Sequence, residues 1–209
     1  MAGLFITFEG GEGVGKSTQI ALLAKRLQQI NIPIQITREP GAGVIGAKLR
    51  DILLHEQVAP KAELLLYLAD RAQHLEEELR PWLSQSQVVL CDRFLDSSEV
   101  YQGFARKLGV EFVRSLHEWL LKEIWPNLTI LLDMPASLGL QRVSGRQTAV
   151  DRLESENIKF HEKLRQGFLQ QAEREPGRIK VVDANDGQQQ VSDNIWRHIE
   201  PMIQKWRAN

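Results

Sequence analysis

The sequence predicts an α/β fold built on a parallel sheet. Short apolar runs alternate along the chain with longer stretches whose apolar residues recur at helical spacing. The apolar runs do not themselves alternate with polar residues, which is typical of strands buried on both faces of a sheet. Strands that alternate with helices are usually joined by right-handed crossovers into one parallel sheet. We therefore expect a parallel sheet flanked by helices.

Five segments have the composition of such buried strands. They are short, rich in Ile, Val and Leu, and separated by stretches long enough for a helix. The predicted strands are residues 4–8, 34–37, 88–91, 128–132 and 179–182.

Apolar stripes predict the helices between these strands. Ile20, Leu23, Ala24, Leu27 and Ile30 follow the i, i+3, i+4, i+7 spacing of one helical face. Further helical segments are predicted near residues 49–53, 64–79, 113–124, 153–172 and 191–206. We expect Pro201 to kink or split the last of these. Gly139, Gly145 and the polar run 144–148 interrupt the pattern and are expected to form a mobile loop.

Length and composition favour one globular domain over residues 1–209. The 209 residues, 43% hydrophobic and 25% charged, match ordinary globular proteins and exclude a disordered, collagen-like or coiled-coil chain. Lys and Arg number 26 against 27 Asp and Glu, so the basic surplus typical of duplex-binding proteins is missing and we expect no nucleic-acid partner.

The same inspection favours a cytoplasmic location and no membrane partner. The N-terminal apolar run ends at Phe8 and is too short for a signal sequence, and the longest apolar stretch, residues 64–69, is far below a membrane span. The single cysteine, Cys91, excludes an internal disulfide and is expected to be a buried core thiol.

Residues 10–17, GGEGVGKS, match the phosphate-binding pattern G-x-x-x-x-G-K-[ST]. Glycines let the backbone turn so that successive N–H groups point at phosphate oxygens, and the following helix adds its positive N-terminus. Lys16 can reach the β- and γ-phosphates, and the Ser17 hydroxyl is a hard ligand suited to Mg²⁺. The pattern lies between an apolar strand and an amphipathic helix, which is the context it requires.

A second glycine pattern, Gly41, Gly43 and Gly46, spells the dinucleotide fingerprint G-x-G-x-x-G. It does not directly follow a strand, and an acid at the required distance is only loosely placed, so we interpret residues 40–46 as a flexible turn before a helix. A nicotinamide or flavin enzyme is thereby disfavoured.

Asp92 and Arg93 follow the third predicted strand. An acid at the carboxyl end of a central strand can hold Mg²⁺ through water beside the phosphate loop, and an adjacent arginine can bind a phosphate. The alternative is that Asp92 is a helix cap or a loop acid. A phosphate loop alone leaves kinases, GTPase switches and motor ATPases open, but the N-K-x-D signature of GTPase switches is absent.

Four runs in order, FEGGEGVGKST (8–18), TREPGA (37–42), LYLADRAQH (66–74) and DRFLDSSEVYQG (92–103), resemble the signatures of thymidylate kinases. With a lid segment at 142–152, the resemblance covers nearly the whole chain. It implies the P-loop nucleoside triphosphate hydrolase fold with a five-stranded parallel sheet, usually as a homodimer. It also implies transfer of the γ-phosphoryl group of ATP to dTMP with Mg²⁺, giving ADP and dTDP.

The resemblance carries roles to individual positions of this chain. For dTMP it implies Arg38 and Arg93 on the acceptor phosphate and Tyr67 and Arg71 at the base. It also implies Tyr101 under the sugar, Ser98 and Gln102 lining the base and sugar, and Glu12 near the sugar 3′-hydroxyl. For ATP it implies the phosphate loop and a lid arginine: Gly10, Gly11, Glu12, Gly13, Val14, Gly15, Lys16, Ser17, Thr18 and Arg142. On this basis we expect Lys16, Glu12, Arg93, Arg146 and Arg152 to be catalytic and Ser17 and Asp92 to hold the metal. The chain departs from the pattern at Tyr67, Phe94, Ala42 and Val100, which stand where Phe, Tyr, Gly and Ala are frequent.

The phosphate loop contains no arginine at its variable positions, so another segment must supply the cation that stabilises the transferring group. Arg142, Arg146 and Arg152 surround the polar lid segment, and we expect Arg146 to make the main contact. A monophosphate acceptor is already ionised at pH 7, so positioning and charge neutralisation suffice. A nucleotide-binding switch and a kinase for dCMP, UMP or a nucleoside remain the alternatives.

Overall fold

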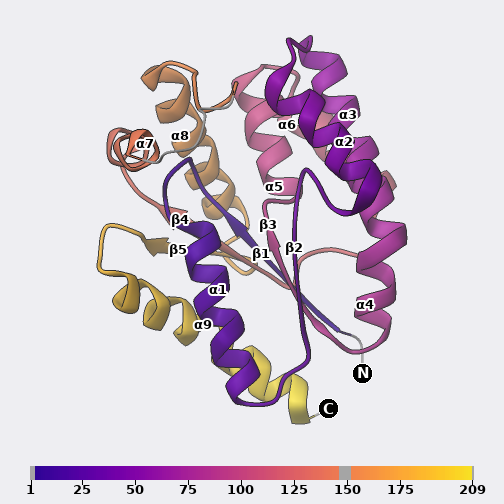
Figure 1. Ribbon diagram of the computed structural model, residues 1–209, viewed down its shortest axis with the longest axis vertical. Coiled ribbons are helices and arrows are strands. Elements are labelled where there is room, and N and C mark those ends of the chain that lie inside the picture. Colours follow the sequence, from indigo (N-terminus) through magenta and orange to yellow (C-terminus); the bar gives the residue numbers. More distant parts are fainter. Residues whose placement is uncertain (1–2, 146–151, 209) are drawn as a thin grey trace.

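The computed structural model describes residues 3–145 and 152–208 and contains a five-stranded parallel sheet of order β2-β3-β1-β4-β5 (Figure 1). The strands are β1 (Leu4–Glu9), β2 (Ile34–Arg38), β3 (Val88–Asp92), β4 (Leu128–Asp133) and β5 (Ile179–Asp183). All five predicted strands are confirmed, and each extends one residue beyond its predicted end. The added residues are all charged, so the parallel arrangement brings charges to one edge of the sheet: Glu9, Arg38, Asp92, Asp133 and Asp183.

Helices connect and cover the strands. They are α1 (Lys16–Gln29), α2 (Gly43–His55), α3 (Pro60–His74), α4 (Arg80–Ser84), α5 (Leu95–Ser98), α6 (Val110–Leu121), α7 (Ala136–Ser144), α8 (Ile158–Arg174) and α9 (Gln188–Ala208). Two π-helical segments, η1 (Leu75–Leu79) and η2 (Glu99–Ala105), continue α3 and α5. None of the described helices is long and apolar enough to cross a membrane.

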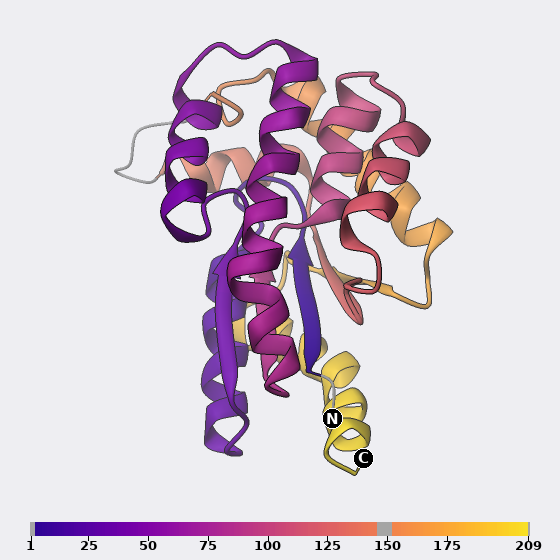
Figure 2. The same cartoon turned by 90° about the vertical axis from the view of Figure 1, so that its right-hand side faces the viewer.

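The sheet lies between two layers of helices (Figures 1 and 2). Helices α1 and α9 cover one face, where Leu23 and Ile199 join the apolar side chains of the strands in one cluster. The other face carries η1, α5 and α6, which bury Phe5 and Val89. Cys91 is fully buried in this second cluster, as predicted for a core thiol.

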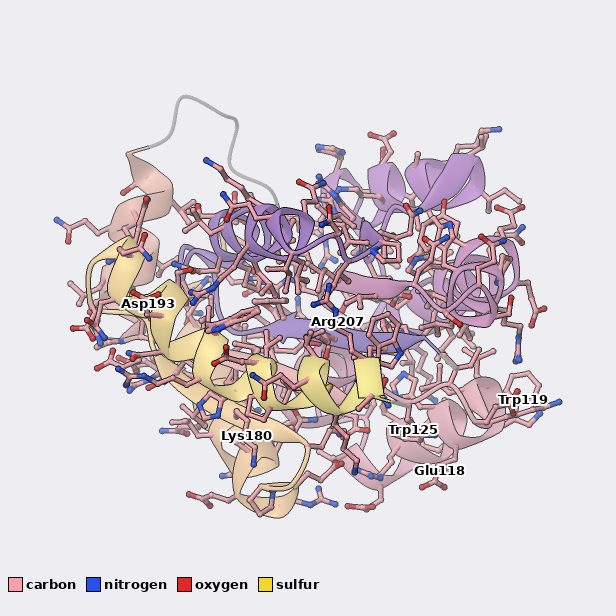
Figure 3. The ribbon with its side chains drawn as sticks, turned by 90° about the horizontal axis from the view of Figure 1, so that it is seen from below. Glu118, Trp119, Trp125, Lys180, Asp193 and Arg207 are labelled. Carbon is pink, nitrogen blue, oxygen red and sulfur yellow. The ribbon has the colours of Figure 1, made fainter. Side chains whose placement is uncertain are left out.

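Helix α9 continues through Pro201, so the expectation that it splits there is wrong. Figure 3 shows it crossing the molecule from Asp193 to Arg207. Its buried residues recur every four positions on both sides of the proline, namely Val191, Ile195, Ile199 and Ile203. Packing of this stripe against the core keeps the helix continuous through Pro201.

Two predicted loops are helical instead. Residues 136–144 form α7. Gly139, near the middle of this helix, does not mark a turn; it is required because the helix backbone comes close to the phosphate loop. A Cβ on Gly13 would lie 2.0 Å from the Gly139 carbonyl oxygen, and a Cβ on Gly139 would lie 2.3 Å from the Glu12 carbonyl oxygen. The end of the expected loop, 146–148, is outside the described residues. Residues 43–46, expected in a turn, form the start of α2.

The segment that forms α5 and η2 shows no apolar stripe in the sequence. Its polar side chains are buried together with its apolar ones, so helical periodicity is hidden: Asp96, Ser98, Glu99 and Gln102 are each at most 2% exposed. Segments of π-helix are often found at functional sites, and η2 carries Tyr101 and Gln102 of the predicted site.

Candidate active site

A cleft of about 290 Å³ opens beyond the carboxyl ends of the strands, where ligands of open α/β sheets bind. It is bounded by the phosphate loop, by α3, and by α5 with η2. The structure brings most of the predicted site residues to this cleft: Glu12, Lys16, Ser17, Thr18, Arg38, Tyr67, Arg71, Asp92, Arg93, Ser98, Tyr101 and Gln102.

The phosphate loop joins β1 to α1. Gly15 precedes α1 with φ 95°, a left-handed conformation that glycine adopts without strain. The Lys16 ammonium is buried and donates to the carbonyl oxygens of Gly10 (3.2 Å) and Gly11 (2.9 Å). Burial and the nearby Arg93 lower the pKa of Lys16, while Glu12 opposes that shift.

Glu12 connects the phosphate loop to the opposite wall. Its Oε1 accepts from Nη2 of Arg93 (2.5 Å) and from the Tyr101 hydroxyl (2.8 Å). Burial alone would raise the pKa of Glu12, but Arg93 and Lys16, with the Tyr101 hydrogen bond, outweigh burial and lower it to about 2. The guanidinium of Arg93 also lies 5.2 Å from the centre of the Tyr101 ring. These contacts place two cations and one carboxylate around a common space.

Arg93 has φ 68°, a left-handed conformation that is uncommon for a side chain of this size. Glu9 supports this turn: its carboxylate accepts from the backbone N–H of Phe94 (2.8 Å) and from the Ser97 hydroxyl (2.6 Å). The same hydroxyl accepts from Nη1 of Arg93 (3.2 Å). Burial, with the nearby Asp96, raises the pKa of Glu9 to about 7.

Ser17 and Asp92 meet beside the phosphate loop, where Ser17 Oγ donates to Asp92 Oδ2 (2.9 Å). Both are oxygen donors that face the cleft, and such ligands suit Mg²⁺, which usually keeps several waters and takes few protein ligands. Within residues 3–145 and 152–208 no group of three His, Cys, Asp or Glu side chains could hold a metal by itself. Ser17 and Asp92 thus offer two oxygen ligands to a cation at this position.

Tyr67 and Arg71 lie one turn apart on α3, as their spacing predicts, and both line the cleft. Arg71 is only 1% exposed, and its Nε donates to Glu39 Oε2 (2.7 Å) while Nη1 donates to Ser98 Oγ (3.0 Å). Burial, with the nearby Glu63, raises the pKa of Tyr67, so its ring is uncharged.

The predicted lid arginines have different environments. Nη2 of Arg152 donates to Glu63 of α3 (2.5 Å) and to the Leu53 carbonyl oxygen of α2 (3.1 Å). Glu63 also accepts from Gln102 (2.8 Å). Arg142 ends α7 and reaches the Ala184 carbonyl oxygen (3.5 Å). Arg146 is outside the described residues.

Sequence reasoning missed several residues of this region. Glu9, Glu39 and Ser97 were not predicted, although all three fall in or beside the motif runs that were recognised. They could have been recognised as polar side chains, an acid or a hydroxyl, within motif runs whose other residues were assigned to the site. Arg38 lines the cleft as predicted and is exposed, and its side chain makes no hydrogen bond or ion pair with another described residue.

Comparisons with known proteins agree with this geometry. A family model described as thymidylate kinase matches residues 8–195. The chain is 45% identical over 201 residues to a thymidylate kinase of Synechococcus sp. (strain JA-2-3B'a(2-13)), covering 96% of each. It is 48% identical over 200 residues to one of Syntrophotalea carbinolica, covering 92% of this chain and 93% of the relative.

The fold is similar to that of a solved thymidylate kinase from Ehrlichia chaffeensis. The TM-score is 0.80 at 26% sequence identity, with 95% of this chain and 100% of the other covered. The family match spans the phosphate loop, both walls of the cleft and most of the sheet. The chain therefore belongs to the thymidylate kinase family.

Proposed function

We propose that this chain transfers the γ-phosphoryl group of ATP to dTMP, giving ADP and dTDP for the supply of dTTP. The observation that carries this proposal is a single cleft lined both by the phosphate loop and by Tyr67 and Arg71 of α3. A triphosphate donor and a base-bearing acceptor can thus meet in the same space, with Arg93 between them.

The charges around Arg93 suit an acceptor that is already ionised. Arg93 and Lys16 both face the cleft, and Glu12 holds the guanidinium while its own charge is retained at neutral pH. A phosphate oxygen needs no general base, so catalysis can rest on positioning and on neutralising the charge of the transition state. Lys16 follows the transferred group, and Arg93 and Arg38 bind the acceptor phosphate.

Ser17 and Asp92 are the proposed holders of Mg²⁺ bound with ATP. When bound, the ion would neutralise the charge that develops on the phosphates. Ser17 Oγ would hold the ion directly, and Asp92, which accepts a hydrogen bond from Ser17 at 2.9 Å, would hold it through water.

The lid arginines complete the proposed donor site. Arg146 is the proposed contact to the transferring group, with Arg152 and Arg142 in support. Arg152 would have to leave Glu63 and the Leu53 carbonyl oxygen to reach the phosphates, so its support requires a rearrangement on closure.

We also propose that the chain works as a homodimer. Phe112 and Trp119, seven residues apart on α6, are 55% and 75% exposed, and Figure 3 shows Trp119 pointing outward at the edge of the molecule. Large apolar side chains exposed on one helix face are typical of a subunit contact. Light scattering should give twice the chain mass for the wild type and the monomer mass for Trp119→Glu.

A cytoplasmic location and the lack of a nucleic-acid partner stay predictions.

The activity is tested by measuring ADP release with ATP and one acceptor at a time. The acceptors are dTMP, dUMP, UMP, dCMP and thymidine. We expect turnover that depends on the acceptor and is fastest with dTMP. Equal use of dCMP and dTMP would contradict the assignment of the acceptor, and ADP release that is independent of any acceptor would favour a nucleotide-hydrolysing switch.

A further inference from the structure

The hydrogen bonds of Arg71 leave one edge of its guanidinium free. An arginine has five N–H donors. In Arg71 the Nε donor goes to Glu39, and the two donors of Nη1 go to Ser98 Oγ (3.0 Å) and to His117 Nε2 (2.6 Å). No hydrogen bond within the described residues uses Nη2. Since Arg71 lines the cleft, the Nη2 edge is the part available to a ligand.

The contact with His117 fixes the protonation of that imidazole. An arginine is always a donor, so Nε2 of His117 must be the unprotonated acceptor and the proton must be on Nδ1. Burial, together with Arg71 and Arg114, lowers the pKa of His117 to about 2, which agrees with a neutral ring at physiological pH. His117 is on α6, is fully buried, and therefore does not reach the ligand itself.

The far side of the same imidazole faces η2. Nδ1 of His117 lies 3.9 Å from Oε1 of Glu99, and both atoms are buried without a hydrogen-bond partner among the described residues. A shift of less than an ångström would bring Nδ1 and Oε1 within hydrogen-bonding distance of each other. Glu99 opens the helix that carries Tyr101 and Gln102, so His117 connects α6 to two walls of the cleft, α3 and η2.

We propose that His117 is a positioning residue for the acceptor base. Its unprotonated Nε2 accepts from Nη1 of Arg71 and so fixes the direction of the guanidinium. The free Nη2 edge then presents N–H donors to a pyrimidine that has a carbonyl oxygen at C4, and it disfavours a pyrimidine that has an amino group there. The inference rests on the proposed function, because it concerns how the same cleft chooses its base. Without the imidazole, the guanidinium keeps its charge but can rotate about its remaining contacts with Glu39 and Ser98.

The test compares His117→Phe, which fills similar space without an acceptor, with His117→Gln, whose amide oxygen can replace Nε2. His198→Phe on the exposed side of α9 is the matched control. The kcat and KM for dTMP and for dCMP, and the KM for ATP, are measured for each variant. A hydrogen bond to a charged group corresponds to about tenfold or more in binding.

We expect His117→Phe to raise the KM for dTMP and to reduce the dTMP-over-dCMP preference about tenfold, with kcat and the KM for ATP within about threefold. His117→Gln should restore most of the preference, and His198→Phe should leave it unchanged. If His117→Phe lowers thermal stability but leaves the preference intact, or if His117→Gln is as impaired as His117→Phe, the positioning role is overturned. A wild-type protein that does not prefer dTMP would instead contradict the proposed function.

Nitrogen NMR of the wild-type histidines tests the proposal even where His117→Phe does not fold. We expect Nδ1 of His117 to carry the proton and Nε2 to be unprotonated from pH 5.5 to 8, with and without dTMP. An Nε2-protonated ring, or a ring that titrates in this range, would exclude the hydrogen bond to Arg71 and overturn the inference.

Discussion

Replacing Glu12 with Gln should destabilise the protein by about 3 kcal/mol at pH 7. The pKa of Glu12 is about 2 in the folded protein against 4.5 for an unperturbed glutamate, and each pKa unit corresponds to about 1.4 kcal/mol. The physical source is the pair of cations beside the carboxylate. Arg93, only 17% exposed, would lose the carboxylate at 2.5 Å, and its repulsion with Lys16 would be offset only by the other nearby acids, Asp92 and Glu9.

The sign of the pH dependence follows from the direction of the shift. Because the folded-state pKa is below the unfolded value, the stabilisation by Glu12 is complete well above pH 4.5 and is lost as the pH falls toward 2. Urea unfolding followed by tryptophan fluorescence gives the free energy of unfolding for wild type and variant. The difference between them should narrow by about 1 kcal/mol between pH 7 and pH 4.

Glu111→Gln is the matched control for this experiment. Glu111 pairs with Arg174 at 2.6 Å, but its side chain is 74% exposed, and such surface pairs usually contribute at most about 1 kcal/mol. If Glu12→Gln is as stable as the wild type at pH 7, or if its deficit does not change with pH, the assignment of Glu12 as the charge that balances the site is wrong.

Three further substitutions test the donor and acceptor sites. Lys16→Ala should lower turnover about 10³-fold, measured as ADP release, and retention of a tenth of wild-type activity would contradict the phosphate-loop assignment. Tyr101→Phe should retain the preference for dUMP over UMP, because the hydroxyl is already donated to a carboxylate and only the ring is left to pack beneath the sugar; loss of the preference would assign it to the hydroxyl. Arg146→Ala should lower kcat at least about 100-fold at saturating ATP and dTMP without changing dTMP affinity, and it should be the most impaired of the three Arg→Ala variants at 142, 146 and 152.

The strands and the phosphate loop could be predicted because their causes are local. The central strands β1, β3 and β4 are buried along nearly their whole length, and their mostly apolar runs are visible in four or five consecutive residues. The edge strands β2 and β5 are only partly buried, and Gln35 and Lys180 interrupt their apolar residues. The loop needs glycines and a lysine at fixed spacing because a few adjacent N–H groups enclose the phosphates. The charged residue that ends each strand was missed as part of the strand, since polarity at the edge of a sheet looks like the start of a loop.

The turn that presents Arg93 could not be predicted from local pattern. Glu9 and Ser97, which hold it, are 88 residues apart in sequence and meet only because β1 and β3 are neighbours in the sheet. A buried glutamate whose oxygens are satisfied by N–H and O–H donors has no signature distinguishing it from a surface acid. The helix 95–105 was missed for the same reason, because burial of its polar residues removes the amphipathic stripe.

Arg38 and Arg71 show why residue type and motif do not determine the role of an arginine. Both were predicted at the acceptor site, and both line the cleft, yet Arg38 is exposed and Arg71 is 1% exposed. A guanidinium can be buried only where other segments supply acceptors. For Arg71 these acceptors are on Glu39, Ser98 and His117, which are 32, 27 and 46 positions away in the sequence. Arg38 is therefore free to follow a phosphate, whereas Arg71 is fixed in direction before any ligand arrives. Selection between two bases depends on a fixed direction, and attraction of a phosphate does not, so the buried arginine is the one expected to set specificity.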